Sequence, residues 1–145
     1  MLEGLRVLLA AALFSGAALD EKPPVYADRD GAIRGYDPVA YFTFGAAIKG
    51  SPRITYEWQG ATWHFVHSGN RDKFAADPQK YAPQYGGYCA YGVAQGYALE
   101  IEPGAWTIVE AKLYLNYSPG VKERWRKDVP GYLRKADANW PEVLK

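Results

Sequence analysis

The first clear pattern of hydrophobic and polar residues lies in the middle of the chain. Ile54 to Trp58 alternates between the two kinds of residue, and Gln59–Gly60 supplies turn residues. Thr62 to Val66 then alternates again, which places Trp63 on one face of a strand and His64 on the other. Two alternating runs joined by a short turn predict a β-hairpin over 54–66.

The same pattern occurs nearer the C-terminus. Ala105 to Val109 and Leu113 to Tyr117 are two further runs suited to strands, with Glu110–Ala111–Lys112 between them. They predict a second hairpin. We find no internal repeat in the sequence.

Helix signals follow each predicted hairpin. Ser68 is placed to cap a helix over 69–76, and Ser118 is placed to cap another immediately after the second hairpin. Pro130 is expected to break that second helix, and a last helix is expected over 132–139. Hairpins mixed with short helices predict an α+β fold: a small antiparallel sheet built from hairpins, with several short helices packed on it.

The N-terminus resembles an export signal. Arg6 precedes the apolar run VLLAAALF over 7–14, and small residues follow over 15–18. We interpret residues 1–19 as a cleaved signal peptide, 20–31 as a linker or extended arm, and 32–145 as one domain. The apolar run is too short for a stable membrane span, so the mature protein is expected to be periplasmic or secreted.

Charge and motifs narrow the function classes. The formal net charge of the 145 residues is only +1, and the charged residues are interspersed, so we expect no nucleic-acid partner. We find no nucleophile elbow, phosphate-binding loop, dinucleotide fingerprint or HExxH motif. These absences favour a binding module over an enzyme.

Several blocks of sequence carry a family resemblance. They are GYDPVAYF (35–42), WHF (63–65), NRDKFAADPQKYAPQYGGYCAYG (70–92), AWTIV (105–109), KLYLNYSP (112–119) and ANWP (138–141). In these blocks the chain resembles exported bacterial proteins of the YHS domain family. The resemblance implies the YHS fold and a link to metal handling. Ala40, Val66 and Asn70 stand at or near the positions where better-known members carry cysteines, so the cysteine-based metal site of those members is not implied here.

The chemistry of a metal site would depend on three residues. Cys89, the only cysteine, lies in a turn rich in glycine and tyrosine, and His64 and His67 are the only histidines. A Cys/His set suits copper or zinc. Cys89 could instead be a redox-active thiol, or a small side chain packed in the core.

Tyrosines flank the same turn. Tyr85, Tyr88 and Tyr91 could line a pocket and orient a small ligand through their hydroxyl groups, or they could fill an aromatic core. The leading hypothesis is an exported YHS-like binding domain that holds a small ligand or a transition-metal ion near the turn over 86–92. The alternatives are a thiol-dependent redox protein or enzyme using Cys89, and a protein-interaction module without a ligand.

Overall fold

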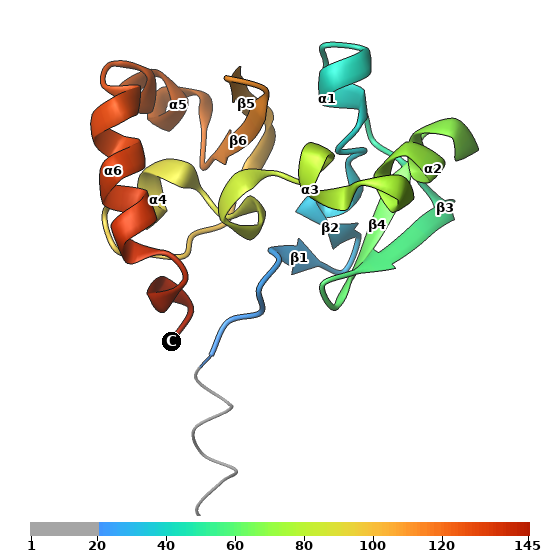
Figure 1. Cartoon of the computed structure of the whole chain (residues 1–145), viewed down its shortest axis with the longest axis horizontal. Helices are drawn as coiled ribbons and strands as arrows, with labels where there is room; N and C mark the ends of the chain where they lie inside the picture. The colour runs from blue at the N-terminus through green and yellow to red at the C-terminus, as the bar shows by residue number, and fades with distance from the viewer. Residues whose placement is uncertain (1–20) are drawn as a thin grey trace, which may run out of the picture.

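The computed structural model describes residues 21–145, so the predicted signal peptide lies outside the described residues. The strands pair as three two-stranded antiparallel sheets, with short helices around them (Figure 1), which confirms the predicted α+β class. The strands are β1 (Ala27–Asp28), β2 (Gly31–Ala32), β3 (Ser51–Trp58), β4 (Ala61–Phe65), β5 (Glu102–Val109) and β6 (Lys112–Asn116). The α-helices are α1 (Ala40–Thr43), α2 (Ser68–Ala76), α3 (Pro78–Tyr81), α4 (Ala90–Ala94), α5 (Pro119–Arg126) and α6 (Val129–Asn139), and the 3₁₀ turns are η2 (Ile33–Gly35), η3 (Gln84–Gly87) and η4 (Glu142–Leu144).

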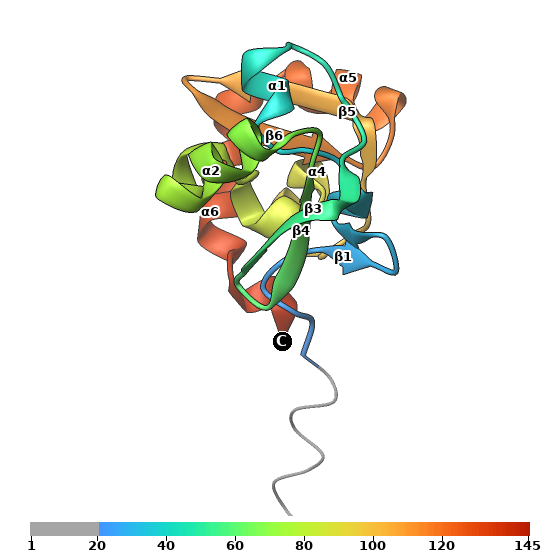
Figure 2. The same cartoon turned by 90° about the vertical axis from the view of Figure 1, so that its right-hand side faces the viewer.

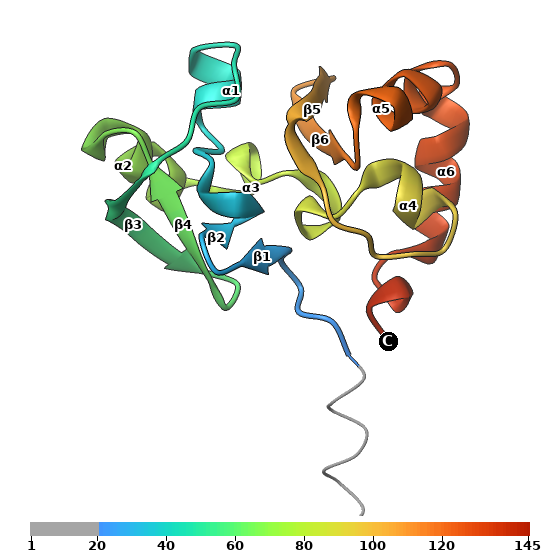
Figure 3. The same cartoon turned by 180° about the vertical axis from the view of Figure 1, so that it is seen from behind.

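The elements form two lobes. β1 to β4 with α1 and α2 make one lobe, and β5 and β6 with α4 to α6 make the other (Figures 1 and 3). Turned by 90°, the molecule shows the two lobes one behind the other (Figure 2). Phe74 lies at the centre of the first core, and Trp125 lies in the second. Leu113 and Leu115 of β6 belong to the core of Phe74, so the lobes share packed contacts.

Both hairpins form where the sequence predicts them, because each has a two-residue turn with positive φ. The central residues are Gln59 and Gly60 in the first turn (φ 54° and 74°), and Glu110 and Ala111 in the second (φ 50° and 63°). Two positive φ values define the turn type whose twist matches that of paired strands. The second turn therefore includes Ala111, a residue that rarely adopts this conformation.

Two predictions about helix ends were wrong. His67, and not Ser68, caps α2: its Nδ1 accepts a hydrogen bond of 3.1 Å from Asn70 N–H. Pro130 does not break a helix; it lies in the first turn of α6, where a missing N–H costs little. The predicted cap at Ser118 is present, with Oγ accepting from Val121 N–H at 3.1 Å.

The segment predicted as an arm lies along the domain. Val25 is buried, Tyr26 N–H donates to Gly86 O at 2.9 Å, and Lys22 N–H donates to Leu144 O at 2.7 Å. The arm thus touches both the central turn and the C-terminus. Within residues 21–145, no helix is long and apolar enough to cross a membrane.

Candidate functional site

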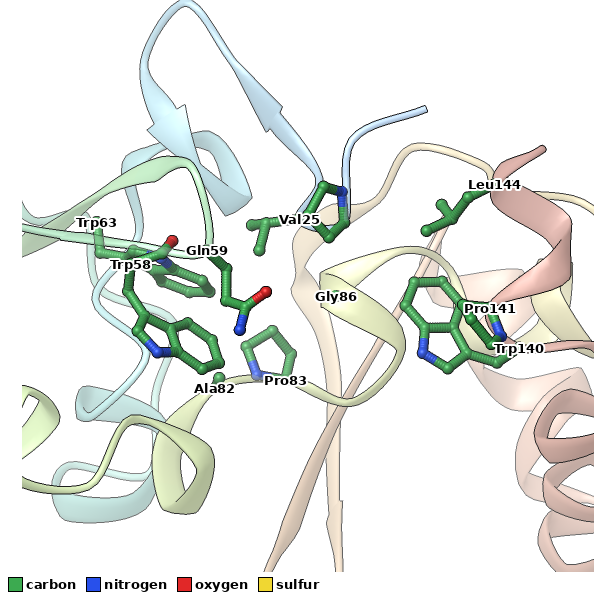
Figure 4. A pocket seen from close by; sticks show the side chains of 11 residues that line it. Val25, Trp58, Gln59, Trp63, Ala82, Pro83, Gly86, Trp140, Pro141 and Leu144 are labelled. Carbon is green, nitrogen blue, oxygen red and sulfur yellow. The ribbon is translucent and has the colours of Figure 1, made fainter. Parts of the chain in front are cut away.

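A cavity of about 260 Å³ lies between the lobes, beside the turn that carries Gly86 (Figure 4). Its lining comes from the arm, the first hairpin near its turn, the segment over 82–86 that leads into η3, and the C-terminal end. The lining residues are Pro24, Val25, Trp58, Gln59, Trp63, Ala82, Pro83, Gly86, Trp140, Pro141 and Leu144. Four segments that are distant in sequence therefore make one mostly apolar site.

One wall belongs to the first hairpin. Trp58 ends β3 and is half-buried, while Trp63 on β4 is fully buried. The indole Nε1 of Trp63 donates to the backbone O of Trp58 at 3.1 Å, which fixes one ring against the other strand. Gln59 follows in the turn, and its side-chain amide extends toward Pro83 (Figure 4). This wall offers an aromatic face and one neutral polar group.

The opposite wall is Trp140, which follows α6 and is half-buried. Its ring packs against Tyr85 and Tyr88, with centroid distances of 6.0 and 6.2 Å. Trp58 and Trp140 lie on opposite sides of the cavity, with Pro83 and Gly86 between them (Figure 4).

Gly86 brings the chain close to the arm. Its φ is +63°, and an added Cβ would collide with the carbonyl oxygen of Pro24. A side chain at this position would push the arm away from the turn. The glycine therefore allows the arm to form part of the cavity wall.

A second cavity of about 430 Å³ adjoins the first and shares Trp58, Ala82, Pro83 and Trp140 with it. Its remaining lining is polar: Gln79, Gln84, Tyr85 and Lys112. Among residues 21–145, Lys112 is the only charged side chain that lines either cavity. The two cavities together, which we call the tryptophan cleft, therefore join an apolar part to a part with one positive charge.

The predicted tyrosine site is only partly present in this cleft. Tyr85 lines the second cavity, but its hydroxyl donates to Asp137 Oδ1 at 2.8 Å, and burial together with that bond raises its pKa above the usual tyrosine value. Tyr88 donates to Pro23 O at 2.8 Å and lines a different cavity with Tyr26.

Tyr91, the third predicted tyrosine, lines neither cavity of the cleft. Its ring is half-buried and packs edge-on against Tyr132, with 5.2 Å between the centroids. Tyr85 and Tyr88 are mostly buried in the second core. These tyrosines thus support the wall at Trp140 and the packing of α4 on α6.

Cys89 is wholly buried just before α4. Its Sγ accepts from Gly92 N–H at 3.3 Å and donates to Asn116 Oδ1 at 3.5 Å. Burial raises the pKa of the thiol, against the lowering effect of nearby backbone N–H groups. The thiol is therefore held protonated near neutral pH, which does not favour its use as a nucleophile.

The three predicted metal ligands do not form one site. Within the described part of the chain, no group of three or more His, Cys, Asp or Glu residues could hold a metal ion. His64 packs beside Gly31 and Gly35, and His67 caps α2 in the same lobe. Cys89 instead contacts β6 of the other lobe through Asn116. The strand-to-helix junction at His67 and the turn at Cys89 therefore belong to different parts of the fold.

The sequence-based search missed Trp58, Trp140 and Lys112. Trp58 and Trp140 are separated by most of the chain, and no local pattern predicts that they meet. The one usable signal was the high number of tryptophans, five in 145 residues. Comparisons with protein-family models, curated proteins and solved structures found no match to this chain.

Proposed function

We propose that this protein is an exported binding domain that holds a small, ring-bearing acid in the tryptophan cleft. The observation that carries the proposal is the cavity between Trp58 and Trp140, next to Gly86. The site lies at the start of the turn over 86–92 where the sequence predicts a ligand. Membership of the YHS family is part of the proposal and rests on the sequence blocks that resemble it.

The size and lining of the first cavity suit a ring. Its volume of about 260 Å³ exceeds the ~150 Å³ of an apolar protein cavity that binds benzene. Two half-buried indoles on opposite sides offer flat apolar faces. A ring placed between them would remove apolar surface of both indoles from water, which is favourable.

The polar part of the cleft selects an anion. Lys112 brings a positive charge, and no Asp or Glu of the described part of the chain lines either cavity. Gln79 and Gln84 add side-chain N–H donors beside it. A carboxylate on the ring would meet these groups, whereas an ammonium group would be repelled by Lys112.

The other functions considered have less support from the same residues. A metal site near Cys89 would need ligands that lie elsewhere in the described fold. A redox role for Cys89 would need access to the thiol, and that side chain is fully buried. Binding of a small molecule in the tryptophan cleft requires neither a set of metal ligands nor an accessible thiol.

The test uses three probes with one ring system and different charge: indole-3-acetate, indole-3-acetamide and tryptamine. Each is titrated into the mature protein by isothermal calorimetry. We expect the acid to bind about tenfold more tightly than the amide, which corresponds to ~1.4 kcal/mol, and tryptamine to bind least.

Variants assign the effect to residues. Lys112→Met should remove the preference for the acid while keeping ring binding, and Trp140→Leu should weaken all probes. Lys127→Met is the matched control, since Lys127 is also exposed but lines neither cavity. Absence of binding for every probe, or binding that Trp140→Leu leaves unchanged in a folded protein, would overturn the proposal.

A further inference from the structure

The two long hairpins share one register, displaced by 51 residues along the chain. In both hairpins the strand register shifts, as at a β-bulge, between the first pair of facing residues and the second. The shift lies between Ser51 and Thr55 in the first hairpin and between Glu102 and Trp106 in the second. In the first hairpin the paired residues are Ser51↔Phe65, Thr55↔His64, Tyr56↔Trp63, Glu57↔Thr62 and Trp58↔Ala61. Adding 51 to each number gives the pairs of the second hairpin: Glu102↔Asn116, Trp106↔Leu115, Thr107↔Tyr114, Ile108↔Leu113 and Val109↔Lys112.

The correspondence continues into the following helix at the same displacement. His67 caps α2 and Ser118 caps α5, each through a bond to the N–H three residues later. Phe74 and Trp125 then occupy matching positions, and both are fully buried. A shared hairpin is common in proteins. A shared bulge, cap and buried aromatic at one constant spacing is a much stronger match.

The segments before the hairpins also correspond, with a displacement of 52 residues. Residues 33–35 have φ values of 44°, 60° and 79°, and residues 85–87 have 57°, 63° and 86°. Three consecutive positive φ values are rare, and three of these six residues are not glycine, for which this conformation is uncommon. A short helix follows each segment, α1 in the first case and α4 in the second.

Between each such segment and its helix lies one buried polar side chain. The first is Asp37, whose Oδ1 accepts from the N–H groups of Val39 (2.8 Å) and Ala40 (3.2 Å). Its Oδ2 accepts from Val66 N–H and from Asn70 Nδ2, both at 2.9 Å. Asp37 thus joins the start of α1 to the end of the first hairpin.

The second is Cys89, at the equivalent position. Its sulfur accepts from Gly92 N–H at 3.3 Å, and the neighbouring Tyr91 N–H donates to Asn116 Oδ1 at 3.0 Å. Tyr91 and Gly92 correspond to Val39 and Ala40, and Tyr117 corresponds to Val66. Cys89 thus bonds to the start of α4 directly through Gly92 N–H, and it reaches β6 of the second hairpin through its bond to Asn116 Oδ1. The Tyr117 N–H, at the end of that hairpin, also lowers the pKa of the thiol.

We propose that the chain is a tandem duplication of one structural unit, over about 33–81 and 85–132, in which Asp37 and Cys89 are the same structural position. The surroundings of Cys89 then suit a buried side chain that accepts hydrogen bonds from backbone N–H groups, and the thiol of Cys89 stands where the other unit has the carboxylate of Asp37. Asn116 is the polar neighbour of Cys89: its Oδ1 accepts from the thiol, and among residues 21–145 its buried Nδ2 has no hydrogen-bond partner.

The duplication also explains the composition of the tryptophan cleft, a consequence that rests on the proposed function. The cleft takes Trp58 and Lys112 from the tips of the two hairpins. Their partners across the strands are Ala61 and Val109, so each unit carries a large side chain where the other carries a small one. Neither unit alone would hold both a ring and its acidic group.

The test of equivalence is Cys89→Asp. A carboxylate placed in a buried site normally unfolds a protein unless donors surround it. We expect Cys89→Asp to keep a cooperative urea transition at pH 7 and the near-ultraviolet circular dichroism of the wild type. Val93→Asp is the matched control: Val93 is equally buried, in the neighbouring helix, and it should lose the transition. Cys89→Asp behaving like Val93→Asp would overturn the proposal.

Amide hydrogen exchange of the wild-type protein gives a second reading that needs no variant. The amides of Gly92 and Tyr117 should be protected to within about tenfold of those of Ala40 and Val66. Exchange at the rate of an open loop at Gly92 and Tyr117 would overturn the equivalence. Both experiments measure folding and not ligand binding, so they can fail or succeed independently of the proposed function.

Discussion

Tyr85 on η3 donates a hydrogen bond of 2.8 Å to Oδ1 of Asp137 on α6. The bond joins the turn that carries Gly86 to the helix that leads into Trp140. The ring of Tyr85 also packs against the indole of Trp140, with 6.0 Å between the centroids. One tyrosine therefore holds two walls of the tryptophan cleft in place.

Replacing that hydroxyl should cost stability. We expect Tyr85→Phe to lower the free energy of unfolding by about 1 kcal/mol, because the ring stays and one hydrogen bond is lost. Urea denaturation measures the change. The control is Tyr91→Phe: within residues 21–145 the Tyr91 hydroxyl has no hydrogen-bond partner, so that loss should be within a few tenths of a kcal/mol. Equal losses in both variants would contradict the assignment.

Alkaline pH should destabilise the fold. Burial raises the pKa of Cys89 and of several tyrosines above their usual values: Tyr41, Tyr85, Tyr88 and Tyr114. In the unfolded chain these groups release protons near pH 8.5 for the thiol and ~10 for tyrosine, before the folded protein does. The stabilisation is therefore complete below about pH 8 and is lost as pH rises.

The measurement is urea unfolding at intervals between pH 7 and 11. We expect the midpoint to fall progressively above about pH 9. Tyr41→Phe should show a shallower fall, because desolvation of the buried Tyr41 phenolate is removed from the balance. A midpoint that stays constant to pH 11 in the wild type would contradict this account.

Gly86 should not tolerate a methyl group. Gly86→Ala would place Cβ against the Pro24 carbonyl oxygen at a positive φ, so we expect the arm to separate from the turn. Gly45→Ala is the matched control, since Gly45 has nearly the same φ (+65°) and no atom within 4 Å of an added Cβ. The control should cost about 1 kcal/mol for backbone strain alone.

Limited proteolysis reads the position of the arm directly. Cleavage by chymotrypsin after Tyr26 should become faster in Gly86→Ala and stay unchanged in Gly45→Ala, because Tyr26 N–H is bonded to Gly86 O when the arm is docked. Urea denaturation measures the loss in free energy of unfolding for both variants. Both carry the cost of an alanine at positive φ, so the extra loss in Gly86→Ala is the cost of the collision with Pro24. Equal behaviour of the two variants would show that the contact with Pro24 does not hold the arm.

Much of the fold was predictable because its signals are local. Alternation over 54–58 and 62–66 reflects two faces of a strand, and the turn residues lie next to each other in sequence. The cap at Ser118 was predicted for the same reason. The cap at His67 was missed because an imidazole rarely takes this role and a serine stands next to it.

The candidate site was less predictable. The sequence predicted a ligand near the turn over 86–92, and of the residues named for it only Tyr85 lines the tryptophan cleft. The three expected metal ligands are chemically suited to a metal, but suitability does not place them together. His64 and His67 remain in one lobe, while Cys89 is buried against β6 of the other.

The sequence by itself determined the two hairpins, most of the helices and the α+β class, since each depends on residues a few positions apart. Only the tertiary structure decided that Trp58 and Trp140 share a cavity and that Asp37 and Cys89 are equivalent. Both relationships depend on packing between distant segments. The equivalence is preserved in backbone geometry and hydrogen bonds to N–H groups, which many side chains can satisfy, so few identical residues remain to reveal it.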